Sequence, residues 1–130
     1  MVFMRVAIST TNGGLDDRVS DVFGRTMSFT IVDVENGEIK NVEVVKNEFA
    51  MRGGGAGIAV SQLLADKGVD VVVTGNVGPN AMSILSSAGI RVYRGSGLKV
   101  RDAIERLMRG ELEEIRSPGR PMGRGRRWLG

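Results

Sequence analysis

The sequence predicts a mixed α/β domain, because strand patterns fill its first half and helices alternate with short strands in its second. Residues 3–9 form a nearly continuous apolar run, which is typical of a buried strand. Asn36-Gly37 stands between two segments in which apolar and polar residues alternate, a strong indication of a β-hairpin. From residue 58 onward, amphipathic segments alternate with short apolar runs, and glycines separate them. This order indicates an antiparallel meander followed by helical crossovers.

The boundaries of the expected elements follow from residues that begin or end helices. Gly68 suits the end of the first helix, Pro79 the first turn of the second, and Gly89 its C-cap. The elements are, in chain order, strands over residues 3–9, 27–34 and 39–46, a helix over 58–67, a strand over 69–73, a helix over 79–88, a strand over 90–93 and a helix that ends at Gly110.

The expected crossovers also predict how the strands are arranged. Right-handed crossovers place the fourth and fifth strands on the far side of the first. The result is a five-stranded mixed sheet of order 3-2-1-4-5 with three helices, the ribonuclease H-like arrangement. We expect this domain to span residues 1–115, and residues 116–130 to form a disordered tail rich in arginine and glycine.

Composition excludes several classes of function. The 130 residues include no cysteine and no histidine, which removes disulfides, thiolate nucleophiles, histidine bases and the usual zinc ligand sets. The net charge of +3 arises in the tail, whose five arginines face no acid, while the preceding 115 residues carry 13 basic and 15 acidic groups. We therefore expect nucleic-acid binding only through the tail. Neither a membrane span nor a leader peptide is indicated, so a cytoplasmic location is expected.

A glycine-rich loop before the first helix is the main candidate binding site. Its members are Arg52, Gly53, Gly54, Gly55 and Gly57. Free N–H groups and the positive dipole end of a helix N-terminus suit an anion there. The loop lacks the lysine of a nucleotide-binding P-loop. The alternative is a crossover that needs glycine only for its backbone conformation.

Further candidates lie where other strands end, because the carboxyl ends of parallel strands meet at one edge of a sheet. Asn76 could contact the ligand or instead cap a loop or helix. Arg25 is a candidate anion clamp, and its alternative is an ion pair with Asp17 or Asp21. The remaining candidates at these strand ends are Thr10, Asn12, Thr74, Gly75 and Gly78.

Metal-dependent alternatives receive less support from the sequence. Asp16, Asp17 and Asp21 could hold a hard cation, but their spacing fits no EF-hand, and solvated loop carboxylates explain them. A two-metal nuclease needs acidic residues on its central strands, and the first strand offers Ser9 and Thr10 instead. Methionines are usually core residues, so only Met51, beside the glycine loop, is a candidate soft ligand.

Five stretches of the chain follow one another as they do in a known family. They are residues 4–8 (MRVAI), 21–25 (DVFGR), 54–58 (GGAGI), 64–81 (LADKGVDVVVTGNVGPNA) and 88–93 (AGIRVY). These stretches resemble the small proteins of dinitrogenase iron-molybdenum cofactor biosynthesis, of the NifX type and of the C-terminal domain of NifB-type proteins. The resemblance implies a ribonuclease H-like fold. It also implies a non-enzymatic role, in which the protein holds or delivers an iron–sulfur or iron–molybdenum type cluster, or its precursor, together with a protein partner.

Two hypotheses of function follow for the glycine loops. In the first, the chain is a carrier whose N–H groups at residues 53–57 and 75–78 hold an anionic cluster, assisted by Arg25, Arg52 and Asn76. In the second, it is a phosphate- or nucleotide-responsive adaptor or regulatory domain that acts with a protein partner. A third possibility, RNA association through the tail, predicts binding that falls steeply with salt.

Overall fold

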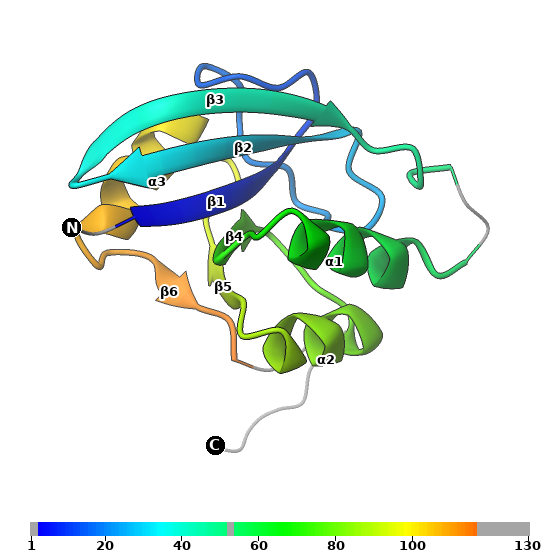
Figure 1. The fold of residues 1–130 in the computed structure, drawn as a ribbon. Coiled ribbons are helices and arrows are strands. Elements are labelled where there is room, and N and C mark those ends of the chain that lie inside the picture. The colour runs from blue at the N-terminus through cyan, green and yellow to red at the C-terminus, as the bar shows by residue number, and fades with distance from the viewer. Residues whose placement is uncertain (1–2, 52–53, 117–130) are drawn as a thin grey trace.

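The computed structural model describes residues 3–51 and 54–116, and shows one mixed sheet covered by helices on both faces (Figure 1). Arg52, Gly53 and the predicted tail from residue 117 onward lie outside the described residues. The elements are β1 (Phe3–Thr10), β2 (Ser28–Glu35), β3 (Glu38–Lys46), α1 (Ala56–Asp66), β4 (Val71–Thr74), α2 (Pro79–Ser87), β5 (Arg91–Arg94), α3 (Val100–Met108) and β6 (Glu113–Glu114).

The order of the strands confirms the predicted sheet and extends it. The sheet runs β3-β2-β1-β4-β5-β6, so the predicted order 3-2-1-4-5 is present in full. β1 pairs antiparallel with β2 and parallel with β4, and β4 pairs parallel with β5. The added strand β6 has two residues and pairs antiparallel with β5. Because β1, β4 and β5 are parallel, their carboxyl ends lie at one edge of the sheet.

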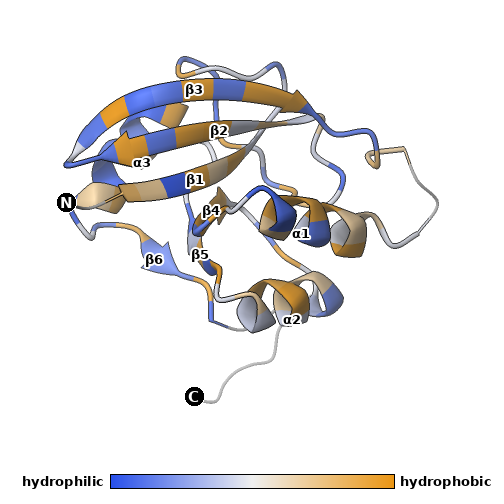
Figure 2. Ribbon diagram, viewed as in Figure 1, coloured by the Kyte–Doolittle hydropathy of each residue, from blue (hydrophilic) through white to orange (hydrophobic). Residues whose placement is uncertain are grey.

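The β2–β3 hairpin is formed by the Asn-Gly turn that the sequence predicts. Asn36 and Gly37 both have positive φ, at 53° and 82°, which a tight two-residue hairpin requires. Glu35 pairs with Glu38 across this turn, and the register shifts once between Asp33 and Val34. β3 forms one edge of the sheet, and its ribbon changes several times between hydrophobic and hydrophilic residues (Figure 2).

Two apolar clusters hold the layers together, one on each face of the sheet. The first joins α1 and α2 to the sheet through residues such as Leu64, Val72 and Leu85. The second joins α3 to the other face through residues such as Ile8 and Ile104. Figure 1 shows α1 and α2 on one side of the sheet and α3 on the other. Both helices of the first side begin at the same end of the molecule, which positions the candidate site.

None of the helices in the described part of the chain combines the length and the apolar character needed to cross a membrane. The longest of these helices, α1, has 11 residues, and a span needs about 20.

Candidate anion-binding site

A pocket of about 350 Å³ opens where α1 and α2 begin. Three segments line it, namely residues 22–25, 55–58 and 78–81. The first segment follows β1, the second begins α1, and the third follows β4 and begins α2. The volume lies at the lower end of the range usual for small-ligand pockets. The site is therefore built from loops that follow β1, β3 and β4, three strands whose carboxyl ends lie at one edge of the sheet.

The N-terminus of α1 presents to this pocket backbone N–H groups that have no acceptor within the helix. Gly55 is the N-cap in the left-handed conformation, with φ 75°, and no side chain caps the helix. The first helical bond runs from Ala59 N to Gly55 O, at 3.0 Å. The N–H groups of Ala56, Gly57 and Ile58 precede that bond, so helix geometry gives them no acceptor within α1.

The N-terminus of α2 lines the same pocket and also presents N–H groups that have no acceptor within their helix. Gly78 is its N-cap, Pro79 occupies the first turn, and no side chain caps this helix either. Its first helical bond runs from Met82 N to Gly78 O, at 2.9 Å, which leaves the N–H groups of Asn80 and Ala81 without an acceptor inside the helix. Neither helix has an acidic residue in its first turn. Two positive dipole ends therefore meet at one pocket with no carboxylate from their own first turns.

Close packing between the helices brings their first turns together. A Cβ added to Gly57 would lie 3.2 Å from the Cβ of Ala81, so glycine allows the two helices to approach. The Ser61 hydroxyl lies 2.7 Å from Gly57 O and 3.4 Å from Ala81 O, between the two turns. This contact fixes the spacing of the two sets of donors.

Residues 22–25 form the third wall of the pocket, and we call this segment the pocket wall. Val22 forms an isolated parallel bridge with Asn76, and Asn76 N donates to Asp21 O at 2.9 Å. Gly24 packs directly on α1, since an added Cβ there would lie 2.7 Å from Gly57 N. Among the described residues that line the pocket, Arg25 is the sole charged side chain. Its Nη1 lies 3.4 Å from Ala50 O.

The structure brings some of the predicted site residues into the pocket. The pocket is lined by Arg25, Gly55, Gly57 and Gly78. Gly54, which directly precedes Gly55, is exposed. Arg52 and Gly53, also predicted for the site, lie outside the described residues.

The predicted residues at the end of β4 support the pocket from behind. Gly75 is buried against the main chain of Asp21, where a side chain has no room. Asn76 is exposed, and its backbone N–H is bonded to Asp21 O. Thr74 is fully buried, with its Oγ1 2.7 Å from Ser9 Oγ. These three residues do not line the pocket.

The predicted residues at the end of β1 do not line the pocket either. Thr10 is fully buried, with its Oγ1 2.7 Å from Ser28 Oγ and 3.1 Å from Thr30 Oγ1. Asn12 N donates to Asp17 Oδ2 at 2.9 Å, and the N–H groups of Thr11 and Gly13 bind the same oxygen. The loop after β1 thus holds a carboxylate of the chain itself.

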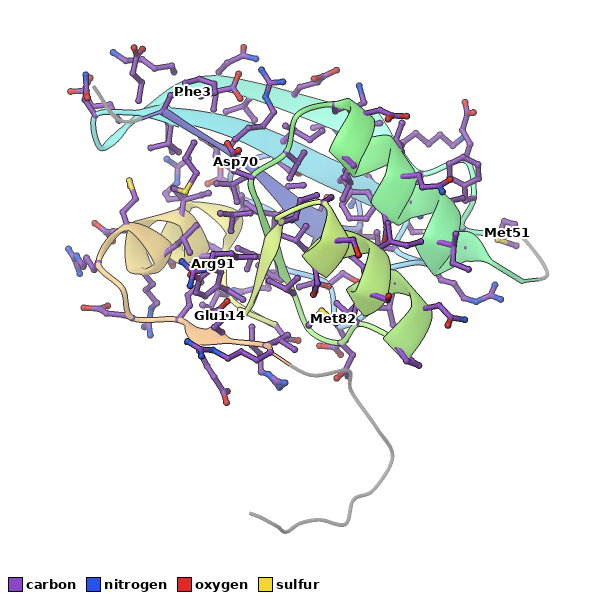
Figure 3. The ribbon with its side chains drawn as sticks, turned by 60° about the horizontal axis from the view of Figure 1, so that its bottom comes forward. Phe3, Met51, Asp70, Met82, Arg91 and Glu114 are labelled. Carbon is purple, nitrogen blue, oxygen red and sulfur yellow. The ribbon has the colours of Figure 1, made fainter. Side chains whose placement is uncertain are left out.

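The three acidic residues between β1 and β2 each contact a different group of the chain. Asp17 accepts the three N–H groups above, Asp16 pairs with Arg101 at 3.1 Å, and Asp21 accepts a bond from the Ser96 hydroxyl. Within residues 3–51 and 54–116, no three or more carboxylates gather as ligands for a metal ion. Met51 is 89% exposed, and Figure 3 shows it at the end of the molecule opposite to Phe3, on the loop that leads to α1.

Sequence reasoning missed part of the pocket lining. Pro79-Asn80 directly follows Gly78 and begins a predicted helix, so the first turn of α2 could have been added from the same helix-terminus argument. Val22 and Ile58 carried no such signal. Val22 reaches the pocket through its bridge to Asn76, a contact between segments 54 residues apart. Ile58 is a partly exposed residue of the first turn of α1.

Comparison with known proteins places this chain in a family. Residues 4–110 match the family described as "Dinitrogenase iron-molybdenum cofactor". An uncharacterized protein of Methanocaldococcus jannaschii is 35% identical over 112 residues, which are 86% of this chain and 92% of that protein.

Two solved structures share the fold along nearly their whole length. The apo form of the orange protein from Desulfovibrio gigas has a TM-score of 0.82 and 36% identity, over 90% of this chain and 97% of that one. A NifB-type protein from Thermotoga has a TM-score of 0.77 and 42% identity, over 92% of this chain and 99% of that one. The chain therefore belongs to the dinitrogenase iron-molybdenum cofactor family.

Proposed function

We propose that the chain is a non-enzymatic carrier that holds an anionic iron–sulfur-type cluster, or its precursor, in the pocket between the first turns of α1 and α2. The observation that supports this most is the meeting of two helix N-termini without side-chain caps, beside Arg25 and with no acidic residue among the described residues of the lining. The family's relation to an iron-molybdenum cofactor supports this class of cargo.

The donors available at the pocket define how such a cargo would be held. The whole sequence lacks cysteine and histidine, so thiolate and imidazole ligation are excluded. Backbone N–H groups and a guanidinium are instead hydrogen-bond donors to the sulfide or other anionic atoms of the cluster periphery. Binding by outer hydrogen bonds, with the metal ions not ligated by the protein, permits release to a partner without breaking a protein–metal bond.

A phosphate- or nucleotide-responsive adaptor that acts with a protein partner is the second candidate. The same N–H groups and helix dipoles stabilise a phosphate group, and the pocket is large enough for one. Both candidates use one set of donors, so the ligand and not the site distinguishes them.

An anaerobic titration of the full chain separates the two candidates. The probes are a water-soluble thiolate-ligated [4Fe–4S] cluster anion, inorganic phosphate and ATP, each followed by amide shifts in NMR spectra. The carrier proposal expects the cluster to shift the amides of residues 22–25, 55–58 and 78–81 more strongly than either phosphate compound. Saturation by phosphate or ATP alone would favour the adaptor, and shifts confined to other surfaces would overturn both.

Arg25→Gln tests the guanidinium in the same titration. Losing a charge-assisted hydrogen bond should weaken cluster binding by about tenfold. Arg109→Gln is the matched control, because it removes the same charge at the end of α3 on the opposite face of the sheet. Equal affinity of the two variants would remove Arg25 from the site.

A further inference from the structure

Two buried hydroxyl groups lie directly behind the pocket wall. Ser9 belongs to β1 and Thr74 ends β4, and both residues are 0% exposed. Their oxygens are 2.7 Å apart across the two paired parallel strands. The residues that precede them, Ile8 and Val73, are apolar and equally buried. Polar groups at such positions reduce stability unless they find hydrogen-bond partners.

The partners of this hydroxyl pair are two carbonyl groups in residues 20–22, the stretch that leads into the pocket wall and includes its first residue. Ser9 Oγ lies 3.0 Å from Ser20 O, and Thr74 Oγ1 lies 3.3 Å from Val22 O. Main-chain bonds run beside them, from Ser20 N to Ser9 O at 2.7 Å and from Asn76 N to Asp21 O at 2.9 Å. Residues 20–22 are thus hydrogen-bonded to the ends of β1 and β4 through side chains as well as through the main chain.

The number of hydroxyl hydrogens limits how these bonds are shared. Each hydroxyl has one hydrogen to donate, and the 2.7 Å separation requires one of the two to donate to the other. One hydrogen therefore remains for the carbonyls of Ser20 and Val22. Either Ser9 donates to Ser20 O while Thr74 donates to Ser9, or Thr74 donates to Val22 O while Ser9 donates to Thr74. In both arrangements the pair stays bonded to residues 20–22, at Ser20 in the first and at Val22 in the second.

Building on the proposed function, we propose that Ser9 and Thr74 are positioning residues for the pocket, which set where Arg25 lies relative to the N–H groups of α1 and α2. Neither hydroxyl lines the pocket, so both act through the main chain of the wall. Gly24 follows Val22 by two residues and lies so close to α1 that an added Cβ would come within 2.7 Å of Gly57 N. When the bond from Thr74 to Val22 O is lost, the pocket wall can rotate about Gly24, where it packs on Gly57. This rotation moves Arg25 away from the N-termini of α1 and α2.

Thr74→Val tests this role, because it removes the hydroxyl and keeps the branched shape of the side chain. In the unliganded protein, we expect amide shifts and faster hydrogen exchange at residues 22–25, with the first turns of α1 and α2 unchanged. Affinity for the thiolate-ligated [4Fe–4S] cluster anion should fall roughly two- to tenfold, the effect of one lost hydrogen bond. Thr74→Ser, which retains the hydroxyl, should restore both properties.

Thr30→Val is the matched control, since Thr30 on β2 is also 0% exposed and its hydroxyl accepts Gly14 N at 3.0 Å. Loss of stability without loss of cluster affinity is expected there. Equal affinity losses in the Val variants of Thr74 and Thr30, or an unchanged wall in Thr74→Val, would overturn the positioning role. If the wild-type protein binds no cluster, the proposed function fails, and the amide shifts and exchange of residues 22–25 alone decide the positioning role.

Discussion

Asp17 is a carboxylate enclosed by the loop that precedes it. Partial burial raises its pKa, but the backbone hydrogen bonds that it accepts outweigh this effect, and the pKa is lowered from its ordinary value. The N–H groups of Thr11, Asn12 and Gly13 lie 3.0, 2.9 and 2.8 Å from one oxygen. A pKa lowered by folding means that the ionised side chain stabilises the folded state above the unfolded-state pKa. This stabilisation is lost as the pH falls through the folded-state pKa.

Asp17→Asn should therefore reduce the free energy of unfolding at neutral pH. We expect a loss of about 1.5–3 kcal/mol at pH 7, the usual contribution of hydrogen bonds to a charged group. The loss should shrink toward pH 3, below the unfolded-state pKa of about 3.9. Urea unfolding at both pH values measures it. Asp16→Asn, which removes an exposed surface ion pair, is the control. A pH-independent loss for Asp17→Asn would show that the charge is not the stabilising feature.

Gly24 is the residue that lets the pocket wall contact α1. A Cβ at this position would lie 2.7 Å from Gly57 N and 2.8 Å from Gly57 Cα, and backbone atoms cannot move aside as a flexible side chain would. Gly24→Ala should lower the free energy of unfolding by about 1–3 kcal/mol, as overpacking does, and shift the amides of residues 22–25. Gly54→Ala is the control in chemical denaturation, because among the described residues an added Cβ there meets nothing within 4 Å. Similar losses in both variants would contradict this packing argument.

Single residues also show how far the site could be predicted. Gly55, Gly57 and Gly78 reach the pocket because the first turns of α1 and α2 pack against each other, with Gly57 beside Ala81. Thr10 ends a strand in the same way, yet its hydroxyl is used by Ser28 and Thr30 on antiparallel β2. These hydrogen bonds depend on the register between β1 and β2, which pairs Thr10 with Ser28. Knowing where each strand ends in the sequence does not give this register.

At the scale of elements, the dipoles of α1 and α2 favour any negative charge placed in the pocket at their N-termini. Ile58→Glu puts a carboxylate in the first turn of α1, where it lines the pocket. This charge should interact favourably with the helix end by about 0.3–1 kcal/mol and compete with an anionic ligand. We therefore expect undiminished stability together with lost cluster binding, measured by thermal unfolding and by the anaerobic titration.

Ile58→Gln separates charge from shape in this test. Glutamine has nearly the size of glutamate and no charge, so it should keep most of the cluster affinity that Ile58→Glu loses. If the two variants bind the cluster equally well, the pocket is not selective for negative charge, and the carrier proposal loses its electrostatic basis.

The elements themselves were largely predictable from local signals. Asn36-Gly37 determined the hairpin, and Pro79 and Gly89 mark the start of α2 and the residue two after its end. β6 was missed, because Glu113–Glu114 has two charged residues and no alternation. It pairs with Tyr93 and Arg94 on β5, with Arg91 and Glu114 3.3 Å apart (Figure 3). Such a strand exists through tertiary contacts, and propensity gives no sign of it.

At the scale of the whole molecule, the pocket and the last strand share one apolar core. Phe23 and Ala81 line the pocket and belong to the cluster that also contains Ile115, immediately after β6. Ile115 is 6% exposed, and its N–H donates to Val92 O at 2.7 Å. The end of the described chain is therefore tied to β5 and packed into the same layer as the site. A cooperative domain with such a core should lose the pocket and the last strand together.

Ile115→Ala tests this coupling. Truncating a buried isoleucine should lower the free energy of unfolding by about 2–4 kcal/mol, because it removes apolar contacts and leaves a cavity. Amide signals of residues 22–25, 78–81 and 113–115 should disappear at one common urea concentration. Glu113→Ala on the same strand, where the side chain is exposed, should change stability by less than about 0.5 kcal/mol. Loss of the 113–115 signals at lower urea than the pocket signals would show that the last strand unfolds independently and does not support the site.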